Sequence, residues 1–163
     1  MAETLRHALP LLAAGQAQKE ITHNEALLAI DRKLHLAVLS MQVAMPPAAP
    51  AAGDAYIVPA GALGAWAGQS GRVASFDGFG WLLSAPVMGT LALVQDLGVF
   101  AFFDGLWRAD AWPVASLSVD GRSVLAAPAV AVAGPSGGGV VDSQCRQAVD
   151  ALISALRSQG VIL

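Results

Sequence analysis

The sequence carries little charge for its size. Aspartate, glutamate, lysine and arginine make up 13% of the 163 residues, and hydrophobic residues make up 55%, whereas soluble domains are usually about 25% charged. A disordered chain is excluded, because disordered segments are rich in charge and poor in apolar residues. Nine Lys and Arg against twelve Asp and Glu leave a net charge of −3. The chain therefore lacks the cationic surplus that a nucleic-acid-binding surface needs.

Cysteine and long apolar helices are also scarce. The single cysteine, Cys145, excludes a disulfide framework and is compatible with a reducing compartment. Uncharged stretches at 78–95 and 123–141 are interrupted by glycine and proline, so neither predicts a membrane-spanning helix. The apolar run at 8–14 contains Pro10, which argues against a signal peptide. We therefore expect a chain that is not inserted in a membrane.

The few charges are unevenly distributed. Residues 1–33 hold eight charges and residues 142–163 hold four, which leaves nine for residues 34–141. Contiguous apolar patches on soluble proteins usually mark interfaces. The pattern predicts assembly with copies of the chain or with other partners. The alternative is that serine, glutamine, threonine and backbone cover the central surface.

The N-terminal region has the periodicity of an amphipathic helix over 15–42. Thr22 and Glu25 match a capping box, so a start at Thr22 is the alternative to a start near Gln16. The segment 45–53 is rich in proline and alanine and predicts an extended connector. The apolar residues at three-four spacing are Leu27, Ile30, Leu34, Ala37, Val38 and Met41.

The following region has the patterns of β-strands. Arg72–Phe76 alternates polar and apolar residues, as a half-buried strand does. Val99–Phe103 is a short apolar run typical of a strand buried on both faces. Asp77-Gly78 and Asp104-Gly105 are strong hairpin signals, and a tryptophan follows each. We expect two similar hairpins in one small antiparallel sheet.

The C-terminal third combines more β-like sequence with a helix. Residues 116–133 contain a turn signal at Asp120-Gly121, and the glycine-rich segment 134–139 predicts a flexible joint. Asp142 is the expected N-cap of the helix, with Arg146 at the favourable i,i+4 position, and Gly160 is its expected end. Its apolar stripe consists of Cys145, Ala148, Val149, Leu152, Ile153 and Leu156.

These elements predict an α+β fold with an N-terminal amphipathic helix, a small antiparallel sheet of hairpins and a C-terminal amphipathic helix. We expect three parts: a helical arm for assembly at 1–45, a β-rich domain at 46–133, and a hinge with the C-terminal helix at 134–163. The two helices supply apolar stripes that can pack between subunits. The assembly residues predicted on these stripes are Leu27, Ile30, Leu34, Val149, Leu152, Ile153 and Leu156.

Gly134–Gly138 matches the G-x-S-x-G pattern of a hydrolase elbow around Ser136. Such an elbow needs a helix directly after the serine and an acid and a histidine downstream. The predicted helix begins six residues later, and all three histidines lie upstream. A convergent triad in the opposite chain order is the alternative. We interpret the segment as a hinge.

No metal or cofactor site is predicted. His7, His23 and His35 have no ligand spacing on a helix, and Cys145 offers no second thiolate. No phosphate-binding glycine motif is present. We therefore assign no catalytic, cofactor-binding or metal-ligating residue.

Tryptophans beside turn aspartates are the candidate ligand site. A flat ring stacks on the C–H face of a sugar, while a carboxylate accepts hydroxyl protons. The candidate carbohydrate-binding residues are Trp66, Trp81, Asp104 and Trp107. The alternative is that the tryptophans form the core of the sheet, since a tight turn also favours Asp before Gly.

The sequence resembles the DUF2793-type family of phages and gene transfer agents of alphaproteobacteria. The resemblance is carried by the run from Leu9 to Leu27, by Gly53–Val58, by Gly64–Gly68, and by the ending with Gly137-Gly138, Asp142, Arg146, Leu156-Arg157 and Gly160. It covers almost the whole chain, although the middle is shorter than in longer members. It implies a virion protein associated with tail fibres or head spikes, without catalytic residues to carry over.

The resemblance implies a non-enzymatic base or adaptor of a head spike or fibre that supports attachment to the host cell surface. The expected partners are copies of the chain in a ring of three to six, capsid vertex or tail proteins, a spike or fibre protein, and host polysaccharide. The expected location is the virion, after assembly in the bacterial cytoplasm. The alternative is a module that binds host capsular polysaccharide directly. Head or tail location and the terminus that faces the particle stay open.

Overall fold

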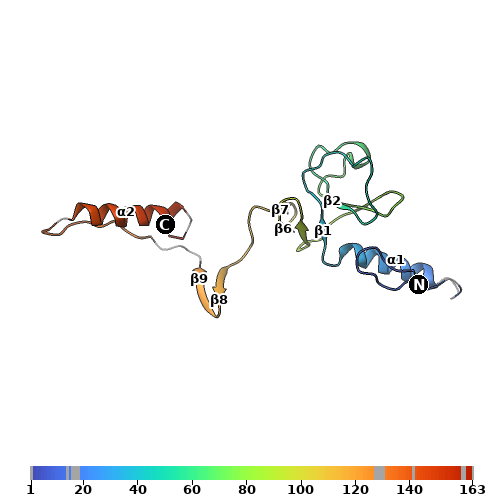
Figure 1. Cartoon of the computed structure of the whole chain (residues 1–163), viewed down its shortest axis with the longest axis horizontal. Helices are drawn as coiled ribbons and strands as arrows, with labels where there is room; N and C mark the ends of the chain where they lie inside the picture. Colours follow the sequence, from blue (N-terminus) through green and yellow to red (C-terminus); the bar gives the residue numbers. More distant parts are fainter. Residues whose placement is uncertain are drawn as a thin grey trace. The chain divides into compact units, whose positions relative to one another are not determined.

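The structure is a computed structural model that describes residues 2–13, 15, 19–126, 131–140, 142–158 and 161–162. The chain forms two compact units, unit 1 at Met1–Trp112 and unit 2 at Pro113–Leu163, and the ribbon of each is drawn in Figure 1. The predicted α+β class is confirmed. The observed division lies between Trp112 and Pro113, whereas the sequence predicted boundaries after residues 45 and 133.

The N-terminal helix is shorter than predicted. Helix α1 spans Lys19–Lys33, so Thr22 lies inside it, and the expected start near Gln16 falls outside the described residues. The chain leaves the helix at His35, whose φ of 43° is left-handed. Val38, expected on the helix, lies instead in strand β1 (Ala37–Val38). The buried residue of α1 is Asp31, so the apolar stripe predicted on this helix does not lie in the core of unit 1, and its packing between subunits stays a prediction.

Unit 1 contains two small sheets instead of the single sheet that was predicted. The first has the order β1-β5-β6-β7, with β5 at Leu91–Val94, β6 at Val99–Phe103 and β7 at Trp107–Arg108. Its β1–β5 pair is parallel, and the other pairs are antiparallel. The second is antiparallel with the order β2-β3-β4, comprising Ala55–Ile57, Val73–Phe76 and Trp81–Ser84.

Both predicted hairpins are confirmed, one in each sheet. Asp77 Oδ1 accepts hydrogen bonds from the backbone N–H groups of Phe79 and Gly80, both at 2.8 Å, in the turn between β3 and β4. Asp104 accepts one from Leu106 at 3.3 Å in the turn between β6 and β7. The glycine after each aspartate has a positive φ, 99° at Gly78 and 111° at residue 105, which explains the Asp-Gly signal.

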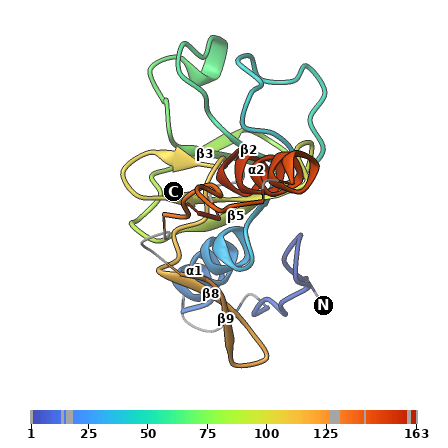
Figure 2. The ribbon, with the colours of Figure 1, turned by 90° about the vertical axis from the view of Figure 1, so that its left-hand side faces the viewer.

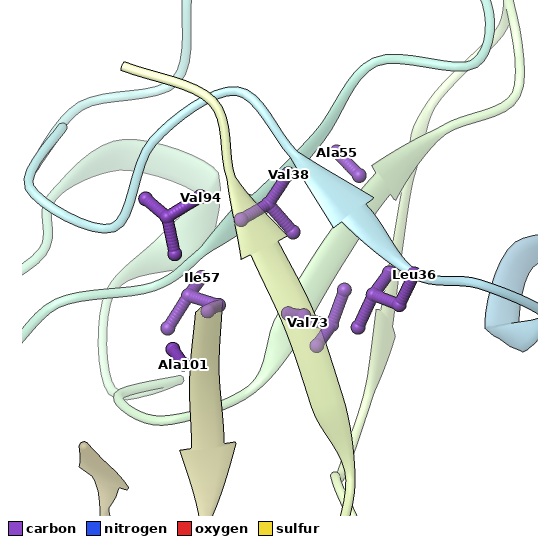
Figure 3. Close-up of a cluster of buried hydrophobic side chains, with 8 residues drawn as sticks. Leu36, Val38, Ala55, Ile57, Val73, Val94 and Ala101 are labelled. Atoms are coloured by element: carbon purple, nitrogen blue, oxygen red, sulfur yellow. The ribbon is translucent and has the colours of Figure 1, made fainter. Parts of the chain in front are cut away.

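The two sheets of unit 1 enclose an aliphatic core. Figure 3 shows the strands that carry these side chains, with β1 and β5 in front of β2 and β3. Apolar residues of both sheets lose contact with water here, which is the main favourable contribution to folding. The buried residues of this cluster are Leu36, Val38, Ala55, Ile57, Val73, Ala92, Val94 and Ala101.

The other face of β2-β3-β4 is covered by an aromatic cluster. Trp66, in the short 3-10 helix η1 (Gly64–Trp66), is 0% exposed and packs against Tyr56 and Trp81 with ring centroids 5.3 and 4.9 Å apart. This sheet is thus covered on both sides. Val73, Ala74 and Ser75 are consecutively buried in β3, so the predicted strand is confirmed but its half-buried character is wrong.

Unit 2 pairs strand β8 (Ser116–Val119) with β9 (Arg122–Ala126) in an antiparallel hairpin. The turn residues Asp120 and Gly121 both have positive φ, 50° and 73°, as the predicted hairpin turn requires. Figure 2 gives a second view of β8, β9 and α2.

Helix α2 spans Ser143–Ser158. Asp142 Oδ1 accepts a hydrogen bond from the Cys145 backbone N–H at 2.9 Å, which confirms the predicted N-cap. Arg146 donates to the carbonyls of Pro135 and Gly137, and no Asp142–Arg146 ion pair is found among the described residues. The predicted end at Gly160 lies outside the described residues. No described helix is both long and apolar enough to cross a membrane.

Candidate functional site

The outer face of the β1-β5-β6-β7 sheet is an open apolar surface. Side chains alternate between the two faces of a strand, and Ala92, Val94 and Ala101 point into the core, where each is at most 1% exposed. The residues between them point outward, and Leu93 pairs with Phe100 across β5 and β6. The sequence therefore predicted β6 correctly, but its burial on both faces is wrong.

Trp112 extends this surface beyond the sheet. Its ring forms edge-to-face pairs with Phe100 and Phe102, with centroids 6.2 and 6.3 Å apart, an arrangement that stabilises aromatic pairs. Phe100 is 56% exposed and Trp112 50%. We call this surface the aromatic face and define it by Leu91, Leu93, Phe100, Phe102 and Trp112.

An aromatic face is unusual on a sheet of this kind. Antiparallel sheets with one covered face usually carry polar residues on the other. Here Arg108 is the charged residue in the paired part of the outer face, since it lies opposite Phe102, and it forms an ion pair with Asp104 at 3.2 Å. The outer strand positions thus expose apolar surface to solvent.

Two of the predicted carbohydrate-binding residues are core residues. Trp66 presents no ring face to a ligand, because it is fully buried. Trp81 packs against Trp66, Tyr56 and Phe76 in the same cluster. The structure therefore places Trp66 and Trp81 in the alternative role that the sequence left open, the core of the sheet.

Trp107 and Asp104 lie elsewhere, at the β6–β7 hairpin. Trp107 Nε1 donates to the Gly71 carbonyl at 2.9 Å, which ties this hairpin to the turn before β3. Trp107 also lines a groove of about 530 Å³ together with Arg72, Ser70 and Met41. Asp104 is exposed at the neighbouring turn. Of the four predicted residues, Trp107 therefore lines this groove.

A second feature, which the sequence analysis missed, is a set of hydrogen bonds that holds residues 4–12 on α1. We call these residues the N-terminal segment. Asp31, 2% exposed, accepts hydrogen bonds from Thr4 Oγ1 at 2.8 Å and from the backbone N–H groups of Arg6 and His7 at 3.0 and 2.8 Å. His7 Nδ1 lies 3.0 Å from the same carboxylate. Burial raises the pKa of Asp31, but these hydrogen bonds outweigh it, and the pKa lies below its ordinary value.

Arg6 closes the C-terminal end of α1. Its guanidinium donates to the carbonyls of Asp31, Arg32, Leu34 and His35 at 2.9 to 3.3 Å. The carbonyls of Asp31 and Arg32 lie in the last turn, which a helix leaves without intrahelical partners, and a cation there also complements the helix dipole. This contact explains why α1 ends before Leu34, although the apolar periodicity continues.

Nearer the N-terminal end of α1, Asn24 binds the same segment. Its side chain accepts a hydrogen bond from the Leu12 N–H at 2.9 Å and donates to the Leu12 carbonyl at 3.0 Å. The polar signal for this docking, Thr4, Arg6 and Asp31, was present in the sequence but carries no recognisable spacing, because the partners are 25 to 27 residues apart.

The predicted assembly residues have different environments. On α1, Leu27 is half-buried, Ile30 is 50% exposed, and Leu34, just beyond the helix, is also exposed. On α2, Ile153 is buried, Leu156 is half-buried, and Val149 and Leu152 are exposed. Both helices therefore present some of these side chains to solvent.

The described residues contain no group of three or more His, Cys, Asp and Glu side chains that could hold a metal ion. Ser136 lies in an irregular segment, and α2 begins at Ser143, so the serine does not stand at a strand-to-helix turn. The hinge interpretation of 134–139 stays a prediction.

The family model described as "Protein of unknown function (DUF2793)" matches residues 23–112, more than half of the chain. The chain belongs to this family. No curated protein matches the chain. The DUF2793 match ends at Trp112, the last residue of unit 1, so it includes both sheets and the aromatic face.

The motifs that carried the resemblance have structural roles in this DUF2793 chain. Gly53–Val58 contains strand β2, and Gly64–Gly68 contains η1 with Trp66. Both contribute to the aromatic cluster beneath the second sheet. These two motifs therefore contribute to the aromatic part of the core of unit 1, whereas the C-terminal ending that also carried the resemblance lies outside the match.

Proposed function

We propose that this DUF2793 chain is a non-enzymatic structural protein of a phage-like particle of the gene transfer agent kind. It forms the base or adaptor of a head spike or fibre and supports attachment of the particle to the host cell surface. It assembles in the bacterial cytoplasm as a cyclic homo-oligomer and resides in the virion. The observation that carries the proposal is the open aromatic face of unit 1.

The aromatic face supports assembly on physical grounds. Removing apolar surface from water contributes about 25 cal/mol per Å², and contiguous exposed apolar patches mark interaction surfaces. The surrounding sequence is also poor in charge, with nine charged residues across 34–141. Copies of the chain, capsid vertex or tail proteins, and a spike or fibre protein are partners that would cover such a surface.

The chemistry of the buried acid also favours a structural role. Both oxygens of Asp31 accept hydrogen bonds from the N-terminal segment, so this carboxylate is held by fixed donors and not presented to a substrate. Its contacts hold secondary structure together.

The test is to image particles produced without this chain and particles complemented with variants. We expect loss of the spikes or fibres in its absence and their return with the wild-type chain. A Phe100→Ser/Trp112→Ser variant should fail to restore them, whereas Leu63→Ser, which changes a residue of similar exposure outside the aromatic face, should restore them. Spikes and fibres that persist without the chain would refute the proposal.

A second candidate function, direct binding of host capsular polysaccharide, is favoured by the groove beside Trp107. The groove combines an indole with Arg72 and Ser70, which offers a stacking surface and hydrogen-bond donors to a sugar. A glycan array should show binding by the wild-type chain that Arg72→Ala and Trp107→Ala abolish. Trp112→Ala, outside the groove, should leave it unchanged, and the absence of any glycan binding would refute this candidate.

A further inference from the structure

Unit 1 exposes a second apolar feature on α1. Ala29, Ile30, Lys33 and Leu34 line a hollow of about 340 Å³. Ile30 and Leu34 are exposed apolar side chains, and Lys33 is exposed at the end of the helix. We call this feature the α1 hollow. It places one cation among three apolar side chains.

The symmetry of a ring restricts what the aromatic face can contact. In a closed ring of three or more copies, each interface joins two different patches, because a contact between identical patches is satisfied by a pair. This step rests on the proposed function, which requires such a ring. The aromatic face therefore needs a second, different patch on the neighbouring copy.

The chemistry of the α1 hollow fits an aromatic ring. A side chain that enters it meets apolar groups and an ammonium, and tryptophan is the best partner for both, since its ring face attracts a cation. Trp112 and Phe100 present such rings about half exposed. Asp110, exposed two residues before Trp112, adds a carboxylate opposite in charge to Lys33. Neither Lys33 nor Asp110 forms an ion pair with another described residue.

Helix α2 is a poorer match for the same face. Its exposed residues Val149 and Leu152 are apolar, but its cations are engaged with carbonyls of unit 2. Arg146 donates to Pro135 at 3.1 Å and Arg157 to Val132 at 2.6 Å. Lys33 is thus better placed to meet the Asp110 carboxylate beside Trp112, since the cation on the face itself, Arg108, is paired with Asp104.

We propose that the aromatic face of one copy docks on the α1 hollow of the next copy, with Lys33 against Trp112 and Asp110. The size of the surfaces favours a ring over a pair. Half-exposed aromatic residues offer roughly 100 Å² each, and a stable interface needs about 800 Å² per partner. A single contact is therefore weak, whereas a ring gains from closure, since each copy makes two contacts.

The test uses the full-length chain and sedimentation velocity across a concentration series. The face variant is Phe100→Ser/Trp112→Ser, and the hollow variant is Ile30→Ser/Leu34→Ser. Each alone should be monomeric where the wild type is a ring. Mixed together they should form a one-to-one pair only at a higher concentration than the ring requires, because a single contact is weak. The pair should grow no further, because one intact face meets one intact hollow. Leu63→Ser and Val149→Ser/Leu152→Ser are controls that should remain rings.

A charge exchange tests the partnership without removing apolar surface. Lys33→Glu and Asp110→Lys should each raise the subunit dissociation constant about tenfold, a change of the size expected for a cation–π contact or close ion pair. The two changes together should restore the ion pair but not the contact of a cation with the Trp112 ring, and so recover part of the loss. Circular dichroism of each variant verifies that unit 1 is folded.

The outcomes separate this inference from the proposed function. A wild-type chain that stays monomeric, on the particle as well as in solution, refutes the proposed function and removes the basis of the inference. A wild-type ring that survives both the face and the hollow changes refutes the inference alone. So does a mixture of the two variants that stays monomeric at the highest concentration of the series. A ring that Val149→Ser/Leu152→Ser dissociates while the hollow variant does not also refutes the inference alone.

Discussion

Replacing Asp31 tests how the N-terminal segment is held on α1. In Asp31→Asn the side chain keeps its shape, but one oxygen becomes an amide NH₂. Oδ1 accepts from Thr4 and His7 and Oδ2 from the Arg6 N–H, so in either orientation the NH₂ faces a donor. The substitution therefore removes a charge and leaves at least one donor without an acceptor.

The magnitude follows from the buried donors. An unsatisfied buried hydrogen-bonding group costs about 1–3 kcal/mol, so Asp31→Asn should lower the free energy of unfolding by about 1–3 kcal/mol. Asp31→Ala removes the acceptor for three donors and would cost more, but the segment can detach and return these donors to water. We expect about 2–4 kcal/mol for the alanine variant, limited by the docking energy of the segment.

The assay combines urea unfolding with amide hydrogen exchange. The Arg6 and His7 amides, which donate directly to Asp31, should exchange faster in both variants, while amides of β3 change less. Glu25→Gln is the matched control, since Glu25 is an exposed acid on the same helix. Unchanged exchange at Arg6 and His7 and an unchanged urea midpoint in Asp31→Asn would refute this account of the segment.

Three further predictions address other parts of the chain. The pKa of Asp31 is lower in the folded state, so the unfolded state takes up a proton first as the pH falls below about 4. The difference in unfolding free energy between wild type and Asp31→Asn should therefore shrink in acid. A constant difference in urea midpoints from pH 6 to pH 3 would contradict this. Trp66→Ala should lower the free energy of unfolding by about 3–5 kcal/mol, because the ring is fully buried, and a loss under 1 kcal/mol by urea unfolding would show that the cluster is not core. Asp142→Ala should destabilise α2 by about 1 kcal/mol, seen as faster exchange of the Cys145 amide, and unchanged exchange would exclude the cap.

The features that the sequence predicted correctly are local. Each Asp-Gly turn is determined by a short side chain that binds its own backbone and by a glycine with positive φ. The α2 N-cap depends likewise on residues three apart. Local hydrogen bonds of this kind are readable from sequence spacing.

The end of α1 was not predictable in the same way. Leu34 and Val38 continue the helical period, and the same residues also fit a short strand. The outcome depends on Arg6, which donates to the carbonyls of Asp31 and Arg32 in the last turn of the helix, and on β5, which pairs with Val38. Both partners are distant in sequence, so periodicity alone could not decide between helix and strand.

The candidate site was predicted in part. The shortage of charge indicated an apolar surface that a partner would bury. The apolar run of β6, however, could not show whether both faces of this strand are buried within the chain or one is exposed to solvent. Ala101 and Phe100 are neighbours in one apolar run, and the sheet places the first in the core and the second in solvent. Likewise, the sequence gives no signal that separates Trp66, which is 0% exposed, from Trp112, which is 50% exposed.

Covering of the aromatic face on assembly is the central claim, and hydroxyl-radical footprinting of the full-length chain measures it directly. Labelling of Phe100 and Trp112 would be compared with that of Phe79, which is 98% exposed on a turn outside the face, across a concentration series. The account predicts that labelling of Phe100 and Trp112 falls as the chain assembles, while Phe79 stays constant. Equal labelling of Trp112 in monomer and assembly would contradict it.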